Sequence, residues 1–278
     1  MRTNLLGINL DSVPKNEAIL RINHFFDKKT ESLITTTNLE FIILARYDEE
    51  FKNIINKKAS LNLIDGSGVV WGIGLTKSWK PKTAVLKEVY VTLQWLLSII
   101  FMPISLIFFK KSVEKVSGSD FALDIARFSA KKNKRLFLLG YRLGFDPNAV
   151  HNASLKLLTD IYNLKIVGAH SGTDSITEEK EIIEMIKKSA ADILMVCFGS
   201  PRQEKWLARN LKKTGCKIGI GLGGTFDFIS GVQKRSPKII RDLGFEWLYR
   251  LFANPSRFRR QLNTIPKFLF LVLMARLK

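Results

Sequence analysis

Short apolar segments alternate with amphipathic segments along most of the chain. The apolar segments are rich in Val, Ile, Leu and Thr, which predicts buried strands, and they lie at residues 32–37, 61–64, 135–139, 165–167, 193–198 and 217–220. Residues 39–58 have the spacing of an amphipathic helix. Glycines follow four of the strands, at positions 66, 140, 199 and 221. Buried strands that end in glycine turns before helices predict an α/β fold, with a Rossmann-like, largely parallel sheet and flanking helices.

One apolar run interrupts this pattern. Residues 89–109 carry no charge and are flanked by Lys87, Glu88 and Lys110. The run is long enough to span a bilayer, but a full crossing would place strands of one sheet on opposite sides of the membrane. Pro103 also interrupts a helix there. We therefore expect a membrane-associating insert at 85–111, a re-entrant or interfacial hairpin that enters one leaflet. A buried core helix is the alternative.

The charge of the chain implies a polyanionic partner. Its net charge is +19, which fits nucleic acid, anionic lipid or a phosphate-rich substrate. Residues 232–278 hold eleven Lys or Arg against Asp242 and Glu246, a net charge of +9, and they include the apolar run 268–275. Basic and apolar character in one segment favours a membrane surface over nucleic acid. We expect anionic membrane lipid as a partner, at the cytoplasmic face of the cell membrane.

Composition narrows the chemistry further. The chain is 46% apolar and 25% charged, as folded proteins are. Its two cysteines, Cys197 and Cys216, lie in apolar stretches without a CxxC partner, and its three histidines are scattered. This pattern argues against a disulfide scaffold or a zinc site and fits a reducing compartment. The first residues lack a long apolar core with a cleavage site, so we expect no signal peptide.

Polar motifs follow the first two predicted strands. Residues 36–38 read TTN and residues 65–68 read DGSG. Ligands of such sheets bind at the carboxyl ends of the strands, so Asp65 on its glycine turn is placed to act as a general base on a sugar hydroxyl. The alternative is that Asp65 caps the helix that begins near Val69.

Two later motifs suit phosphate. Residues 198–206 read FGSPRQEKW and open a helix, whose amide groups favour a phosphate or a polar sugar, although Gly-Ser-Pro is also an ordinary turn. Residues 219–227 read GIGLGGTFD, a glycine-rich loop of the kind that cradles a diphosphate. No Gly-Lys-Ser/Thr follows, so the loop is not a P-loop. Asp227 is either a hydrogen-bond acceptor or a cap.

Taken together and in this order, the motifs resemble the WecG/TagA/CpsF family of glycosyltransferases, glycosyltransferase family 26. The resemblance covers roughly residues 5–262, and it rests on residues 36–38, 65–68, 117–120, 138–140, 167–172, 198–204, 223–227, 234–237, 244–250, 255–257 and 260.

The resemblance implies an inverting, metal-independent glycosyltransferase without a cofactor. The donor implied is a UDP-sugar, with N-acetylmannosamine or N-acetylmannosaminuronic acid as the leading sugars. The acceptor implied is N-acetylglucosamine on a polyprenyl diphosphate, in the synthesis of cell-surface polysaccharide or teichoic acid. The chain would divide into a catalytic domain at 1–245 and a basic C-terminal appendage at 246–278 that meets the membrane and closes over the site.

The resemblance also implies roles for single residues. Asp65 matches the presumed base, and three C-terminal arginines match those that meet the diphosphate in the family. Substrate-binding positions carried over by the motifs are Thr36, Asn38, Gly66, Asp120, Gly140, Gly199, Gln203, Glu204, Gly223, Gly224, Asp227, Arg250, Arg257 and Arg260. Two other classes are weighed against this interpretation: an inactive UDP-sugar-binding membrane scaffold, and a basic nucleic-acid-binding protein. The second would need a spread basic face interleaved with exposed aromatic side chains.

Overall fold

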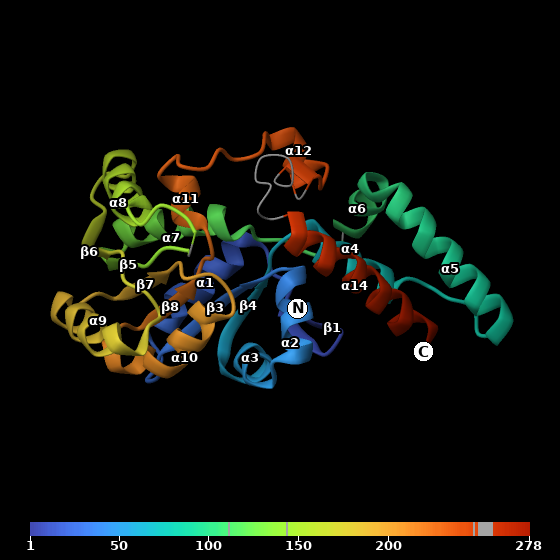
Figure 1. The fold of residues 1–278 in the computed structure, drawn as a ribbon, viewed down its shortest axis with the longest axis horizontal. Helices are drawn as coiled ribbons and strands as arrows, with labels where there is room; N and C mark the ends of the chain where they lie inside the picture. Colours follow the sequence, from blue (N-terminus) through green and yellow to red (C-terminus); the bar gives the residue numbers. More distant parts are fainter. Residues whose placement is uncertain (111, 143, 247, 250–257) are drawn as a thin grey trace.

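One sheet organises the chain. The computed structural model describes residues 1–110, 112–142, 144–246, 248–249 and 258–278. The sheet has eight strands in the order β1-β2-β4-β3-β8-β7-β5-β6, and every neighbouring pair is parallel except β1 and β2 (Figure 1). The predicted α/β fold with a largely parallel sheet is thus confirmed. The strands are β1 Arg2–Leu5, β2 Ile8–Asp11, β3 Ser32–Thr37, β4 Ala59–Ile64, β5 Arg135–Leu139, β6 Lys165–His170, β7 Ile193–Val196 and β8 Ile218–Gly221.

Helices connect the strands and cover both faces of the sheet. They are α1 Lys15–Phe25, α2 Leu39–Tyr47, α3 Glu49–Asn53, α4 Ser67–Lys77, α5 Ala84–Ile100, α6 Met102–Lys110, α7 Gly118–Lys131, α8 Ala149–Asp160, α9 Ile176–Ser189, α10 Arg202–Thr214, α11 Thr225–Ile229, α12 Lys238–Asp242 and α14 Phe258–Leu277. The single helix expected at 39–58 is instead α2, α3 and a π-helical turn at Ile54–Lys58. Asp48 causes the break, since its side chain accepts a hydrogen bond from the Phe51 amide and starts α3.

The N-terminal hairpin was not predicted. Its strands β1 and β2 have only four residues each, and Leu6 and Gly7 between them have φ angles of +52° and +87°. The hairpin extends the sheet beside β4, where the Asn62 amide donates a 2.8 Å hydrogen bond to the Asp11 carboxylate. Four-residue strands give too little alternation to be recognised from the sequence.

Apolar side chains form a core on each face of the sheet. Buried residues of α1, α7, α8 and α11 pack on one face. On the other face, α9 and α10 pack near β7 and β8, while α2, α4 and α14 form a separate cluster near β1 and β4. Strands β3 and β8 pair in the middle of the sheet although 185 residues separate Thr36 from Gly221, which hydrogen-bond across this pair. Such a junction between two halves of a parallel sheet is where ligands of α/β proteins bind.

The apolar run of the insert folds as two helices. The axes of α5 and α6 differ by 101°; together they have the length and apolarity of a span, whereas no single helix among the described residues has both. Helix α5 is not the buried core helix of the alternative interpretation, because only Val91 and Ser98 of its residues are buried.

The last helix packs beside the insert. Helix α14 contacts α2, α4 and α5 (Figure 1). Its Phe268 and Val272 are buried. The sequence also predicts a helix start at Asn254 and Pro255, a cap residue followed by proline, and both lie outside the described residues.

Candidate active site

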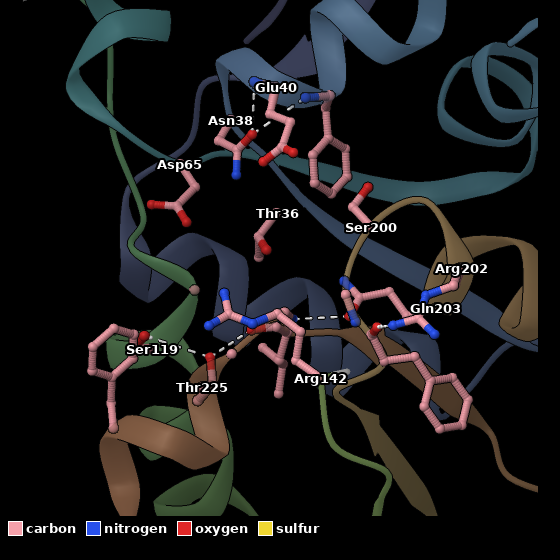
Figure 2. A pocket seen from close by; sticks show the side chains of 18 of the residues that line it. Thr36, Asn38, Glu40, Asp65, Ser119, Arg142, Ser200, Arg202, Gln203 and Thr225 are labelled. Carbon is pink, nitrogen blue, oxygen red and sulfur yellow. Dashed lines mark hydrogen bonds between the residues drawn. The ribbon is translucent and has the colours of Figure 1, made fainter. Parts of the chain in front are cut away.

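A polar cavity of about 350 Å³ lies at the carboxyl ends of the central strands. Figure 2 shows Asp65, Asn38 and Glu40 along one side of it and Arg142 across from them, with Thr36 between. The cavity is lined by Thr36, Asn38, Glu40, Phe41, Asp65, Gly118, Ser119, Arg142, Phe145, Phe198, Gly199, Ser200, Arg202, Gln203, Leu222, Gly223, Gly224, Thr225 and Phe228. Seven of the residues predicted from the sequence are among them: Thr36, Asn38, Asp65, Gly199, Gln203, Gly223 and Gly224.

Asp65 follows β4 directly and stands next to Thr36. Its amide donates a 2.8 Å hydrogen bond to the Thr37 carbonyl, which fixes the turn against β3. A Cβ atom on Gly118 would lie 3.1 Å from the Thr36 hydroxyl and 3.5 Å from an Asp65 carboxylate oxygen. Glycine at 118 therefore leaves the carboxylate and the hydroxyl open to the cavity, close to one another.

Asn38 has a structural role as well as a place in the cavity. Its side-chain oxygen accepts hydrogen bonds from the Glu40 and Phe41 amides, at 2.9 and 3.2 Å, and so caps α2. Its amide nitrogen points into the cavity (Figure 2). The cap also sets the direction of Glu40, whose carboxylate lies beside Asn38. Two carboxylates, Asp65 and Glu40, therefore line this side of the site.

Gln203 holds together the two glycine loops of the cavity. Its side-chain oxygen accepts hydrogen bonds from the Gly199 amide at 3.1 Å and the Gly223 amide at 2.9 Å. These two amides are therefore engaged by the protein, and the motifs around them do not present them to a phosphate. Gln203 lines the cavity as predicted, but it does so as a brace between the loops after β7 and β8.

Glu204 lies beneath the cavity. It has no exposed surface, and its carboxyl group accepts a 2.6 Å hydrogen bond from the Gln203 side-chain nitrogen. A Cβ atom on Gly221 would lie 2.6 Å from the same carboxyl oxygen, so only glycine leaves room for it. Burial raises the pKa of Glu204 to about 7, against the opposing effect of the Gln203 hydrogen bond. Glu204 therefore contacts Gln203 and is not among the residues that line the cavity.

Arg142 supplies a cation on the opposite side of the cavity. Its guanidinium carbon lies 3.5 Å from the centre of the Phe145 ring, and one of its nitrogens lies 3.7 Å from the buried Asp227 carboxylate. Its side chain is only 12% exposed, which means that the protein has already removed most of its water. A Cβ atom on Gly224 would lie 3.4 Å from the guanidinium carbon. The loop after β8 thus passes directly over this side chain.

The amino ends of three long helices meet at the same cavity. Helix α2 begins after Asn38, α7 begins at Gly118, and α10 begins at Arg202, and these three residues line the cavity. The positive ends of the helix dipoles favour an anion there, in addition to the arginine side chains. Arg202 itself is bound to Asp174 at 2.9 Å and to the Phe198 carbonyl.

Several predicted residues do not line this cavity. Gly140 makes room for a neighbour, because a Cβ atom there would lie 2.2 Å from the Phe198 ring. Asp227 lies beneath the cavity, beside Arg142. Asp120 pairs with Arg235 and Arg241; although partial burial opposes the effect, the Arg235 hydrogen bond and both positive charges hold the pKa of Asp120 below its usual value.

The side chains of the three predicted C-terminal arginines are not among the described parts of the structure. Arg250 and Arg257 lie outside the described residues, and for Arg260 only the backbone, in α14, is described. Their predicted contact with a diphosphate therefore stays a prediction. Within the described residues, no three His, Cys, Asp or Glu side chains gather as a metal site.

A second cavity, of about 180 Å³, adjoins the first and has the opposite character. Asn38, Glu40 and Asp65 line both. Its apolar side chains come from α2, α4, α6 and α14: Leu39, Trp71, Met102, Ile265, Phe268 and Leu269. Its other lining residues are Gly66, Ser67, Gly68, Gly244, Glu246, Gln261 and Thr264. Asp65 therefore stands where a polar and an apolar cavity meet.

Sequence analysis missed Glu40, Ser119, Arg142 and Arg202 as lining residues. Glu40 carries the one usable signal, since it stands in the first turn of a helix that follows a polar motif. Arg142 follows the glycine turn after β5, and a single arginine at such a position is not a motif that predicts a site. Its position becomes meaningful only when the loops after β5, β7 and β8 come together.

Known proteins resemble this chain along nearly its whole length. The family model described as "Glycosyl transferase WecG/TagA/CpsF family" matches residues 3–94 and 91–278, two segments that join within α5. A relative in Bacillus subtilis (strain 168), the N-acetylglucosaminyldiphosphoundecaprenol N-acetyl-beta-D-mannosaminyltransferase, is 27% identical over 250 residues, which cover 90% of this chain and 82% of the relative. The predicted resemblance is therefore confirmed, and the chain belongs to the WecG/TagA/CpsF family of glycosyl transferases.

Proposed function

We propose that the protein transfers an N-acetylhexosamine-type sugar from a UDP-sugar to N-acetylglucosamine on a polyprenyl diphosphate, with inversion and without a metal ion. One observation carries the proposal: a polar cavity and an apolar cavity meet at Asp65. A nucleotide-sugar fits the first by its charge and hydroxyl groups, and a lipid-linked acceptor fits the second by its apolar chain. The carboxylate at their junction lies where the two substrates would react.

The polar cavity suits the donor diphosphate. The amino ends of α2, α7 and α10 and the Arg142 guanidinium all direct positive charge into it. Its volume of about 350 Å³ is in the range of small-ligand sites. We assign the predicted arginines of the appendage, Arg250, Arg257 and Arg260, to the same diphosphate once acceptor and donor are bound.

The reaction needs one base and a stabilised leaving group. Asp65 takes the proton of the acceptor hydroxyl, the hydroxyl oxygen attacks the anomeric carbon, and the bond from that carbon to the diphosphate breaks with its electron pair on UDP. Attack from the face opposite the diphosphate inverts the anomeric centre. The negative charge that grows on the departing UDP is met by arginines and helix amino ends, which is the role a metal ion has in other transferases.

The apolar cavity suits the first isoprene units of the acceptor. Trp71, Phe268 and Leu269 line it, together with Met102 from the insert. An acceptor seated there places its diphosphate and sugar beside Asp65 and Glu40. Because such an acceptor is held in a membrane, we place the protein at the cytoplasmic face of the cell membrane. We divide the chain into a catalytic domain at 1–245 and an appendage at 246–278.

The relative in Bacillus subtilis supports the choice of sugar. Its name describes the transfer of N-acetyl-beta-D-mannosamine to N-acetylglucosaminyldiphosphoundecaprenol. We propose the same class of acceptor here, and N-acetylmannosamine or its uronic acid as the sugar, for the synthesis of cell-surface polysaccharide or teichoic acid.

A donor panel tests this function. The full chain is incubated with N-acetylglucosamine on a short-chain polyprenyl diphosphate and with single UDP-sugars, and release of UDP and the product are measured. We expect turnover with a UDP-N-acetylhexosamine or its uronic acid, none with the Asp65→Asn protein, and a β-linked product from an α-linked donor. Absence of transfer with every donor, or an α-linked product, would refute the proposed reaction.

A further inference from the structure

Helix α5 makes polar contacts with the protein on its inner side and exposes most of its apolar side chains on its outer side, together with Glu88 and Thr92. The Trp95 ring N–H donates a 3.0 Å hydrogen bond to the Leu269 carbonyl, and the Ser98 hydroxyl accepts one of 3.1 Å from the Trp71 ring. Gln94 accepts a hydrogen bond from Arg276 of α14. On the other side, the exposed fractions range from 44% to 72% for Val85, Leu86, Val89, Leu93, Leu96, Leu97 and Ile100. A surface helix of a water-soluble protein has the reverse arrangement.

Helix α6 continues the same surface. Its Leu106 is buried, and the Phe109 ring fills the space that a Cβ atom on Gly74 would need, only 2.2 Å away. These contacts hold α6 against α4. Its other side carries the exposed Ile104, Ile107 and Phe108, preceded by the exposed Phe101. We call the exposed apolar side chains of residues 85–108 the outer apolar face.

The charges around the outer apolar face are almost all positive. Between residues 66 and 113 the sequence has six lysines, at 77, 80, 82, 87, 110 and 111, and Glu88 as the one acidic residue. The neighbouring helix α14 adds Lys267 and has no acidic residue, and Lys278 follows its last residue. An apolar surface with a lysine border matches an anionic bilayer in both its interior and its headgroups.

We propose that the outer apolar face docks the protein on an anionic bilayer with α5 lying flat in the interface. Helix α5 is held in its C-terminal half by Gln94, Trp95 and Ser98, so it cannot turn end-on without losing three contacts to α4 and α14. The bend of 101° keeps α6 on α4 instead of extending α5 into a span. Figure 1 shows α5 along one edge of the molecule, beside α14, with most of the sheet on the far side of α14.

The docked orientation also provides a route for the acceptor; this step rests on the proposed function. Met102 lines the apolar cavity beside Asp65, while its neighbour Phe101 belongs to the outer apolar face. An isoprenoid chain in the bilayer therefore reaches Asp65 along apolar side chains, without passing through water.

Vesicle flotation with the full chain tests the docking. We expect the protein to float with vesicles of phosphatidylcholine and phosphatidylglycerol, and about tenfold less with phosphatidylcholine alone. The double variant Leu93→Glu/Leu97→Glu should lose at least tenfold in binding. The matched control is Leu155→Glu, which also replaces an exposed leucine (65%) but on α8, at the other end of the molecule, and should bind as the unmodified protein does.

A second measurement separates a flat helix from an inserted one. Single cysteine replacements at Val89, Leu93 and Leu97 are labelled with an environment-sensitive fluorophore; the native Cys197 and Cys216 are buried at 1% and 0% exposure and do not compete. We expect equal, shallow quenching depths at the three positions. Depths that increase steadily along α5 would overturn the flat orientation, and labels that stay in water would overturn the docking.

Two further outcomes have clear meanings. If the protein does not float but forms a concentration-dependent dimer that Leu93→Glu/Leu97→Glu dissociates, the face binds a second copy and the proposal is wrong. Transfer to a water-soluble acceptor without vesicles should be unchanged in the double variant. Failure of the unmodified protein in that assay, with flotation intact, would refute the proposed reaction and leave the docking standing.

Discussion

The side-chain amide of Gln203 is fixed from below by the carboxyl group of Glu204. The 2.6 Å hydrogen bond uses the amide nitrogen, so the amide oxygen is turned to the Gly199 and Gly223 amides. If the amide flipped, its nitrogen would face two N–H donors and both loops would lose their acceptor. A buried carboxyl group that touches no substrate thus sets the shape of the donor side of the cavity.

Removal of the Glu204 charge should make stability less dependent on pH. Burial raises the pKa of Glu204 to about 7 from 4.5, so the folded protein binds more protons than the unfolded chain between these values. Stability should therefore fall as pH rises through this window, by roughly 1–3 kcal/mol at pH 8. Glu204→Gln keeps an acceptor for Gln203 and removes the charge. We expect its melting temperature to fall less than that of the unmodified protein between pH 5 and pH 8, and parallel pH profiles would contradict this assignment.

Asp65 and Glu40 are distinguished by conservative replacement. Both carboxylates line both cavities, but only Asp65 lies beside Thr36 in the pocket that Gly118 leaves open. We expect Asp65→Asn to lower kcat by about a hundredfold or more while UDP binding, measured by calorimetry, is retained. Glu40→Gln should lower kcat by no more than about tenfold. A reversal of these two effects would assign the base to Glu40.

The fold was largely predictable because buried parallel strands leave a strong signal. Six of the eight strands appear in the sequence as apolar runs, four of them followed by a glycine. The β1–β2 hairpin and the break at Asp48 were missed, since four-residue strands and a single cap carry little periodicity. The sequence also did not predict that α5 exposes its apolar side chains, because the side of an apolar helix that faces the protein is known only once its neighbours are known.

The site was predictable where a motif supplies both position and chemistry. Asp65, Thr36 and Gln203 line the cavity as expected. Glu204 was expected beside a substrate and instead lies beneath Gln203, since sequence alone does not separate the first-turn positions of a helix by the side they face. Arg142 was missed because its role arises from three loops that the sequence does not connect.

Replacement of Arg142 should weaken donor binding. Its guanidinium is held by Phe145 and Asp227 on the donor side, where a diphosphate would form charge-assisted hydrogen bonds. We expect Arg142→Met to raise the Kd for UDP by roughly 10–100-fold. The Kd of Arg142→Lys should lie between those of the unmodified protein and Arg142→Met, since lysine keeps the charge but lacks the planar guanidinium that binds two oxygens at once. Arg209→Met, at an exposed pair with Glu179, is the control and should bind UDP normally. Equal Kd values for all of them would remove Arg142 from the donor site.

Chelation should leave the reaction intact. The proposed cations are arginines and helix amino ends, and neither is affected by EDTA. We expect turnover with EDTA to stay within about twofold of the untreated rate, measured as UDP release. Loss of activity that Mg²⁺ or Mn²⁺ restores would show that the leaving group needs a metal ion.

Gly118→Ala offers the sharpest test of the space around Asp65. The added methyl group would lie 3.1 Å from the Thr36 hydroxyl and 3.5 Å from the Asp65 carboxylate, so it would occupy the place where an acceptor hydroxyl must approach. Gly118 is the first residue of α7, where alanine suits a helix at least as well as glycine, so the fold should keep its melting temperature within about 2 °C.

The variant should therefore separate catalysis from stability. We expect kcat/KM for the acceptor to fall at least tenfold, about 1.4 kcal/mol of transition-state stabilisation. UDP binding should change little, because we assign the diphosphate to the Arg142 side of the cavity. Lys131→Ala, at the exposed far end of α7, controls for changes in the helix itself. A Gly118→Ala enzyme with normal kcat/KM would mean that the acceptor does not approach between Thr36 and Asp65, and the assignment of Asp65 as the base would fail with it.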